Sequence, residues 1–111
     1  MALTSEENEI CAQEIRELIP DTKMNYKVYK SLDSIAMKGK VILTMEANPC
    51  FGGSISYESE ILTSPTWRIV AIKADEMLKS IKTEGHCFLE GIERVAEEKG
   101  VQIVSFKMSP G

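Results

Sequence analysis

The sequence predicts an α+β fold: a single-layer antiparallel or mixed sheet of four to five strands, packed against a long central helix and an N-terminal helix. Two patterns support this prediction. Apolar residues recur with a helical period over 64–83, and apolar and polar residues alternate over 40–47 and 54–62, as in half-buried strands. With 111 residues and no linker or repeat, the chain is expected to form one domain, 1–111, around one hydrophobic core.

The central helix has the clearest pattern. Ser64 is expected to cap its start, Pro65 suits the first helical position, and Gly85 follows its end. Its apolar face consists of Trp67, Val70, Ala71, Ala74, Met77, Leu78 and Ile81. Ile69 and Ile72 lie outside this face, among charged residues. They are expected either to be ordinary exposed side chains or to contact a second surface, such as the N-terminal helix or another copy of the chain.

The N-terminal helix is predicted over 5–19. Thr4 and Glu7 have the spacing of a capping box, in which each side chain accepts a hydrogen bond from the backbone N–H of the other. Pro20 is expected to end the helix. The apolar stripe is narrow and consists of Cys11, Ile15, Leu18 and Ile19.

Three strands are predicted in the middle of the chain. Residues 25–37 fit a strand and a helix equally well, and a short strand followed by an irregular turn ending at Gly39 is favoured. Residues 40–47 and 54–62 are clearer strands. The turn-forming residues 48–53 connect them, so the pair is expected to form a β-hairpin whose polar side faces water.

The segment 86–100 is predicted as a helix in preference to a strand. On a helix its apolar residues would share one face and Gly100 would be a good stop, although Gly91 would cost about 1 kcal/mol. On a strand the alternation is poor, but 97–100 would form a hairpin turn. The last segment, 101–108, is predicted as a central strand because apolar residues occupy both of its faces.

The charge of the chain argues against two classes of partner. It has 13 Lys and Arg against 17 Asp and Glu, a net charge of −4 and a pI near 5.0. Binding to nucleic acids or to anionic membranes depends on a basic surface, which is therefore not expected. No apolar run approaches the roughly 20 residues that cross a bilayer, and the N-terminus lacks the pattern of a signal peptide.

The three cysteines, Cys11, Cys50 and Cys87, are an odd number without paired spacing. They are expected to be free thiols in a cytoplasmic protein. Cys11 and Cys87 adjoin apolar residues, so both are expected to fill the core as small apolar side chains.

No motif with a fixed catalytic or nucleotide-binding mechanism is present. His86, the only histidine, lies four residues before Glu90, so the two would share a face on a helix or on a strand. Such a pair would act as a general acid or base, or would form a surface ion pair. No third metal ligand is visible beside them, so neither a metal nor a cofactor is predicted.

Cys50 is the second candidate for chemistry. It lies in the glycine-rich segment 49–53, where a thiol would be a nucleophile if His86 lay close by. The alternative is that Cys50 covers the edge of the core.

Six aromatic and methionine residues are candidates to line a pocket between helix and sheet. They are Tyr26, Tyr29, Tyr57, Trp67, Met45 and Met77. The alternative is that these residues form the core itself.

These patterns favour a non-catalytic cytoplasmic module that binds a small apolar or mixed ligand or a protein partner, and that forms a homodimer through Ile69 and Ile72. The alternative is a small hydrolase or transferase that uses Cys50, or His86 together with Glu90. A thiol with a lowered pKa would distinguish the two, because a catalytic Cys50 would be alkylated quickly near neutral pH.

Overall fold

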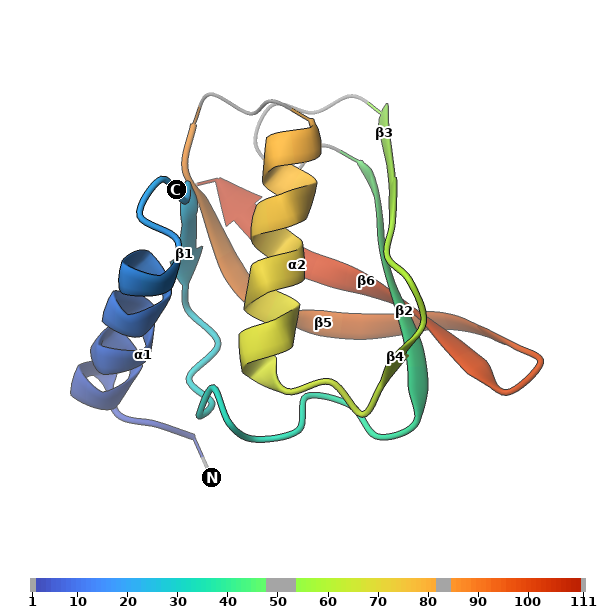
Figure 1. Ribbon diagram of the computed structural model, residues 1–111, viewed down its shortest axis with the longest axis horizontal. Coiled ribbons are helices and arrows are strands. Elements are labelled where there is room, and N and C mark those ends of the chain that lie inside the picture. The colour runs from blue at the N-terminus through green and yellow to red at the C-terminus, as the bar shows by residue number, and fades with distance from the viewer. Residues whose placement is uncertain (1, 48–53, 82–84, 111) are drawn as a thin grey trace.

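The computed structural model describes residues 2–47, 54–81 and 85–110, and within these ranges it contains two helices and six strands (Figure 1). In chain order they are α1 (Ser5–Leu18), β1 (Met24–Tyr26), β2 (Lys40–Ala47), β3 (Ser54–Glu58), β4 (Leu62–Thr63), α2 (Trp67–Ser80), β5 (Cys87–Glu98) and β6 (Val101–Pro110). The prediction of an α+β fold is confirmed, with six strands in place of four to five.

The strands form one mixed sheet. Neighbouring strands follow the order β1-β5-β6-β2-β3, and the short β4 pairs with the start of β2. β1 runs parallel to β5 and β2 parallel to β6, whereas the hairpins β2–β3 and β5–β6 are antiparallel. The central position predicted for the last strand and the predicted hairpin between β2 and β3 are both confirmed.

Both helices lie on one side of this sheet. In Figure 1, α2 crosses in front of the strands and α1 lies beside it, next to β1. Burial along β2 agrees: Val41, Leu43 and Met45 are buried, whereas Ile42 and Thr44, which point the other way, are partly exposed. The described part of the chain is therefore a two-layer structure with one covered and one open sheet face.

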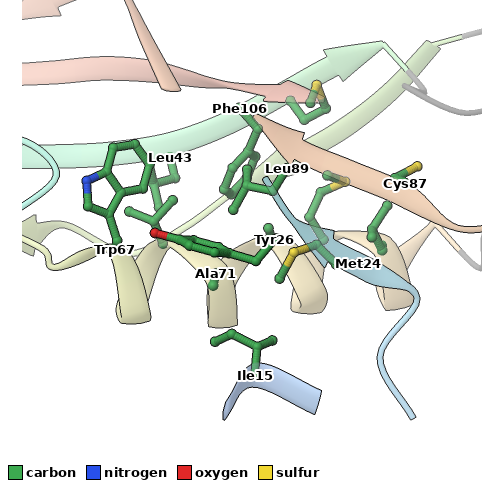
Figure 2. Close-up of a cluster of buried hydrophobic side chains, with 14 of the residues drawn as sticks. Ile15, Met24, Tyr26, Leu43, Trp67, Ala71, Cys87, Leu89 and Phe106 are labelled. Carbon is green, nitrogen blue, oxygen red and sulfur yellow. The ribbon is translucent and has the colours of Figure 1, made fainter. Parts of the chain in front are cut away.

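The hydrophobic core fills the space between the helices and the covered face. Figure 2 shows side chains from both layers converging there, among them Ile15 from α1, Tyr26 from β1 and Leu43 from β2. The helix α2 contributes Trp67, Val70, Ala71, Ala74, Met77 and Leu78. This is the face that the helical period predicted, and burying each large side chain contributes about 1.5–3 kcal/mol.

The helix α2 is shorter than predicted at both ends. Thr66, not Ser64, caps its start by accepting a hydrogen bond from the backbone N–H of Ile69. Ser64 has a φ of 45° and exchanges two hydrogen bonds with Gly39, at 2.7 and 3.0 Å. The residue expected to begin the helix therefore joins the start of α2 to the turn before β2. The helix ends at Ser80 rather than at residue 83.

The helix α1 begins with the predicted capping box: the N–H of Thr4 donates to Glu7 at 3.0 Å, and the N–H of Glu7 donates to Thr4 at 3.2 Å. The buried Asn8 ties this helix to β1 and the following loop. Its amide donates to the carbonyl of Tyr26 at 2.8 Å and accepts from the N–H of Tyr29 at 2.9 Å. These bonds satisfy a buried polar side chain and hold α1 in place.

The prediction of a helix over 86–100 is wrong, because this segment forms the long strand β5. Register shifts between Leu89 and Gly91 and between Arg94 and Ala96 mark two β-bulges. The first bulge places Leu89 and Ile92 on the same face although they are three residues apart. The bulges therefore disrupt the alternation of a strand and imitate the spacing of a helix.

The cysteines differ from the expectation of three free thiols. Cys11 is free and partly exposed, whereas Cys87 is buried and disulfide-bonded. The prediction that Cys87 is a free thiol is therefore wrong, whereas the prediction that it lies in the core is confirmed. Neither described helix is long and apolar enough to cross a membrane.

Candidate functional site: the open face of the sheet

The proposed acid–base pair lies at the start of β5. His86 directly precedes the strand, Glu90 is the additional residue of its first bulge, and both side chains are exposed. Among the ion pairs of the described residues, none joins His86 to Glu90. The bulge explains this arrangement, because it removes the regular alternation that would put both side chains on one face. The nucleophile candidate Cys50 lies outside the described residues.

The candidate pocket residues lie in the core. Tyr26, Met45, Trp67 and Met77 are buried, and Tyr57 packs against the same cluster. Tyr57 also contacts Phe106, with ring centroids 6.1 Å apart, and burial raises the pKa of the Tyr57 hydroxyl to about 12. These side chains fill the space between the helices and the sheet, in agreement with the alternative that they form the core.

Trp67 also reaches the surface. It lies beside Ser31, Ser34 and Ile35 in a depression between α2 and the loop after β1. Met45 is buried on the covered face, and its position in β2 lies next to a groove on the open face of the sheet. Tyr29, the sixth candidate, follows β1 with a φ of 60°.

The interface candidates Ile69 and Ile72 lie on the outer side of α2. Ile69 is 37% exposed and Ile72 is partly exposed. Next to them, Arg68 forms ion pairs with Glu14 of α1 and with Asp33, each at 3.2 Å. The N-terminal helix is thus linked to this side of α2 by charge, and Ile69 retains an exposed apolar surface.

A second charged cluster joins the other end of α2 to the loop between α1 and β1. Lys79 Nζ lies 2.9 Å from Asp21 Oδ1 and 3.0 Å from Asp75 Oδ2. The hydrogen bond from Lys79 lowers the pKa of Asp21, and the two carboxylates raise the pKa of Lys79. Asp75 is only 4% exposed, and its Oδ1 has no hydrogen-bond partner in the described structure. This cluster positions α2 and is part of the covered side of the protein.

The helices leave the other face of the sheet uncovered. Ile42 of β2 pairs with Ile103 of β6, and Thr44 pairs with Ser105, so these four side chains point away from the helices. Ala96 of β5 pairs with Ile103 on its other side and continues the row. Apolar and small polar side chains therefore lie next to one another across three strands.

A groove of about 450 Å³ crosses one end of this open face, between the β5–β6 hairpin and the β2–β3 hairpin. Its floor consists of Thr44, Val95, Ala96, Ile103 and Ser105. Val95 is the additional residue of the second bulge in β5 and is 58% exposed. Bulges bend and twist a strand, which accounts for a concave surface at this end of the hairpin.

Three carboxylates surround the groove. Glu46 comes from the end of β2, Glu58 from β3 and Glu98 from the end of β5, and all three are exposed. Within the described ranges, none of the three takes part in an ion pair or a hydrogen bond. The groove therefore combines an apolar floor with unneutralised negative charge. In the same ranges, no group of three His, Cys, Asp or Glu side chains has the arrangement of a metal site.

The opposite end of the open face has a different character. Lys27 Nζ lies 5.6 Å from the centre of the Phe88 ring, so a cation covers this partly exposed aromatic side chain. Lys107 points to the same face near Gly91. Neither lysine lines the groove.

Sequence analysis missed this surface. The alternation in 40–47 predicts a polar side that faces water, but Ile42 lies on that side together with Lys40, Thr44 and Glu46. The apolar residues on both faces of 101–108 were interpreted only as a sign of a central strand. Together, Ile42 and Ile103 were the available signal for an apolar patch on the open face.

Comparisons with known proteins add no further information: no family model, no curated protein and no solved structure matches the chain.

Proposed function

We propose that the protein is a non-catalytic binding module that contacts a protein partner through the open face of its sheet. The observation that carries this proposal is the groove on the face opposite the helices, with the partly exposed Ile103 in its floor. Contiguous apolar surface on a folded domain is typical of interaction sites, because water contact there is unfavourable. An open groove of this kind fits a protein segment better than a small molecule, which is usually enclosed on most sides.

The enzymatic alternative, a small hydrolase or transferase, has less support. General acid–base catalysis by His86 and Glu90 would require the two side chains to act on one substrate in a site that excludes water. Both side chains are exposed, so water would reach a substrate held beside them. The proposal therefore assigns no catalytic role to either residue.

The experiment that tests the proposal compares two variants as bait in an extract of the source cells. Ile103→Lys places a charge on the groove floor, and Ile10→Lys places one on the outer face of α1, where Ile10 is 63% exposed. We expect the wild type and Ile10→Lys to retain the same partner and Ile103→Lys to lose it. The midpoint temperature of thermal unfolding should be close to that of the wild type for both variants, since a lysine at either position reaches solvent. Retention of the partner by a folded Ile103→Lys variant would contradict the proposal.

A homodimer through Ile69 and Ile72 is the second candidate assembly. It rests on the exposed surface of Ile69 on the outer side of α2. Replacing both isoleucines with Asp would put four carboxylates into a two-fold contact and should dissociate such a dimer. Light scattering that shows a monomer for the unmodified protein at high concentration would exclude this candidate.

The expected cytoplasmic location rested on free thiols, and the disulfide at Cys87 removes that basis, because disulfides persist mainly in oxidising compartments. A cytoplasmic location therefore stays a prediction. Blocking free thiols under denaturing conditions directly after an acid quench of the cells, then reducing and labelling the remainder, tests it, because denaturation exposes the buried Cys87. In a cytoplasmic protein with free thiols both Cys11 and Cys87 should carry the first label, whereas in an oxidised protein Cys11 should carry it and Cys87 should not.

A further inference from the structure

We propose that the segment bound in the groove is basic and amphipathic, with apolar side chains that contact the floor and Lys or Arg side chains that contact Glu46, Glu58 and Glu98. This inference rests on the proposed function, because it specifies the partner of the same surface.

The charge state of the three glutamates is the first argument. In the described structure some surface carboxylates are neutralised by a lysine, since Glu60 lies 2.7 Å from Lys73 and Asp21 lies 2.9 Å from Lys79, whereas others, such as Glu6, form no ion pair. The groove glutamates have no such neighbour. Complementary charge in a partner would pair with these carboxylates and would favour association of the correct partner.

The floor of the groove supplies the second argument. Val95, Ala96 and Ile103 offer apolar contact, and their positions on β5 and β6 fix them on a hydrogen-bonded hairpin. A partner with charged groups alone would leave this floor in water. A partner with apolar groups alone would leave the carboxylates unpaired and partly desolvated, which is unfavourable. Only a segment with both kinds of side chain satisfies the whole groove.

A second copy of the chain fits less well. In a two-fold contact centred on the groove, Glu46, Glu58 and Glu98 of one copy would face the same residues of the other, and like charges at close range repel. Among the described residues, the open face carries Lys27, Lys40 and Lys107, none of which lines the groove, and Lys27 already contacts Phe88. Nucleic acids and anionic lipids are disfavoured for the same electrostatic reason.

The test uses a synthetic peptide of alternating Lys and Val as the probe and one of alternating Glu and Val as its counterpart. Binding is followed by backbone amide chemical shifts of the isotope-labelled protein at about 50 mM salt, where screening is moderate. We expect the Lys–Val peptide to shift the amides of Thr44, Ile103 and Ser105 and the Glu–Val peptide to leave them unchanged. Raising the salt to about 500 mM should weaken the binding several-fold.

A pair of matched triple variants separates the groove from general attraction to an acidic protein. The first changes Glu46, Glu58 and Glu98 to Gln, and the second changes Glu6, Glu9 and Glu17, on the outer face of α1, to Gln. Both remove the same net charge. We expect the groove variant to bind the Lys–Val peptide about tenfold more weakly and the α1 variant less than about twofold more weakly, since exposed charge pairs each contribute a small factor.

Each other outcome overturns the inference. Equal weakening by the two triple variants would indicate diffuse attraction, and shifts away from the groove, or none, would mean that the groove does not bind such a segment. Self-association that is lost in the groove variant would identify a second copy as the occupant. The proposed function fails separately: if Ile103→Lys loses the partner from the extract while the groove triple variant retains it, the open face binds a protein but not through charge.

Discussion

The two faces of the same sheet differ in how their apolar residues are used. On the covered face, Leu43 and Val104 are fully buried beneath the helices. On the open face, their sequence neighbours Ile42 and Ile103 are only partly buried, although they are equally apolar. The comparison teaches that the number of apolar residues in a strand does not reveal which of them the chain itself covers. Apolar residues that remain partly exposed in a row, beside unpaired charges, support the proposal that this face contacts another molecule.

The largest expected effect comes from loss of packing on the side of α2 that covers the sheet. Leu78 is 1% exposed, so Leu78→Ala removes buried apolar contacts, leaves a cavity, and should lower the free energy of unfolding by about 2–5 kcal/mol. Ile69→Ala, on the outer side of the same helix, should cost less than about 1 kcal/mol. Urea unfolding followed by circular dichroism measures both. Equal costs would contradict the assignment of a covered and an exposed side to α2.

The next effect concerns Asp75, the one charged side chain that is buried among the described residues. Lys79→Met would leave its carboxylate buried without a partner, and the uncompensated desolvation of Asp75 should cost about 1–3 kcal/mol. Asp75→Leu removes that carboxylate and should stay within about 1 kcal/mol of wild type, because apolar replacements of buried charges are often neutral.

The double variant provides the control for this prediction. When Asp75→Leu is already present, Lys79→Met should have little additional effect on the urea midpoint, since Lys79 then contacts only the exposed Asp21. Strictly additive effects would show that Lys79 does not act through Asp75.

Sequence patterns predict the helices and strands in which the apolar residues recur with the regular period of that element. Local rules predict the helices α1 and α2, the strands β2 and β6, and the capping box of Thr4 and Glu7. The structure contains all of these features. The strand β5 was missed because its two bulges break the alternation on which strand prediction depends. The predicted start of α2 differs from the observed one because Ser64 and Thr66 both have side chains that can cap a helix. Only the tertiary contact of Ser64 with Gly39 decides between them.

The candidate site was beyond sequence analysis for a different reason. Glu46, Glu58 and Glu98 come from three strands and meet only through the order in which the sheet is assembled. That order includes the parallel pairing of β2 with β6, which local patterns do not encode. The burial of Asp75 was likewise hidden, because helical spacing alone does not show that the side of α2 next to its apolar face is also covered.

A third prediction uses a tyrosine as a probe of the covered face. Burial raises the pKa of Tyr57 to about 12, above the value of about 10 for an unfolded chain. The neutral hydroxyl therefore contributes stability that is fully present below about pH 10 and is lost as the pH rises towards 12. Ultraviolet titration of the folded protein should show tyrosinate formation near pH 12, and Tyr57→Phe should remove one such step. Ionisation of Tyr57 near pH 10 in the folded state would contradict its burial.

The smallest expected effect gives the most direct comparison, since it uses two neighbouring residues of β6 that point in opposite directions. Ile103→Thr replaces a partly exposed side chain of the open face by another β-branched residue, and it should cost less than about 1 kcal/mol. Val104→Thr places a hydroxyl group in the core, where Val104 is fully buried, and should cost about 1–3 kcal/mol unless the hydroxyl finds a partner. Binding of the Lys–Val peptide should change in the reverse order, because only Ile103 lines the groove. Urea unfolding and peptide titration of the same two variants measure both quantities. If Ile103→Thr proves the more destabilising of the two, Ile103 belongs to the structural core of the domain. That result would contradict the proposal that the open face is a binding surface.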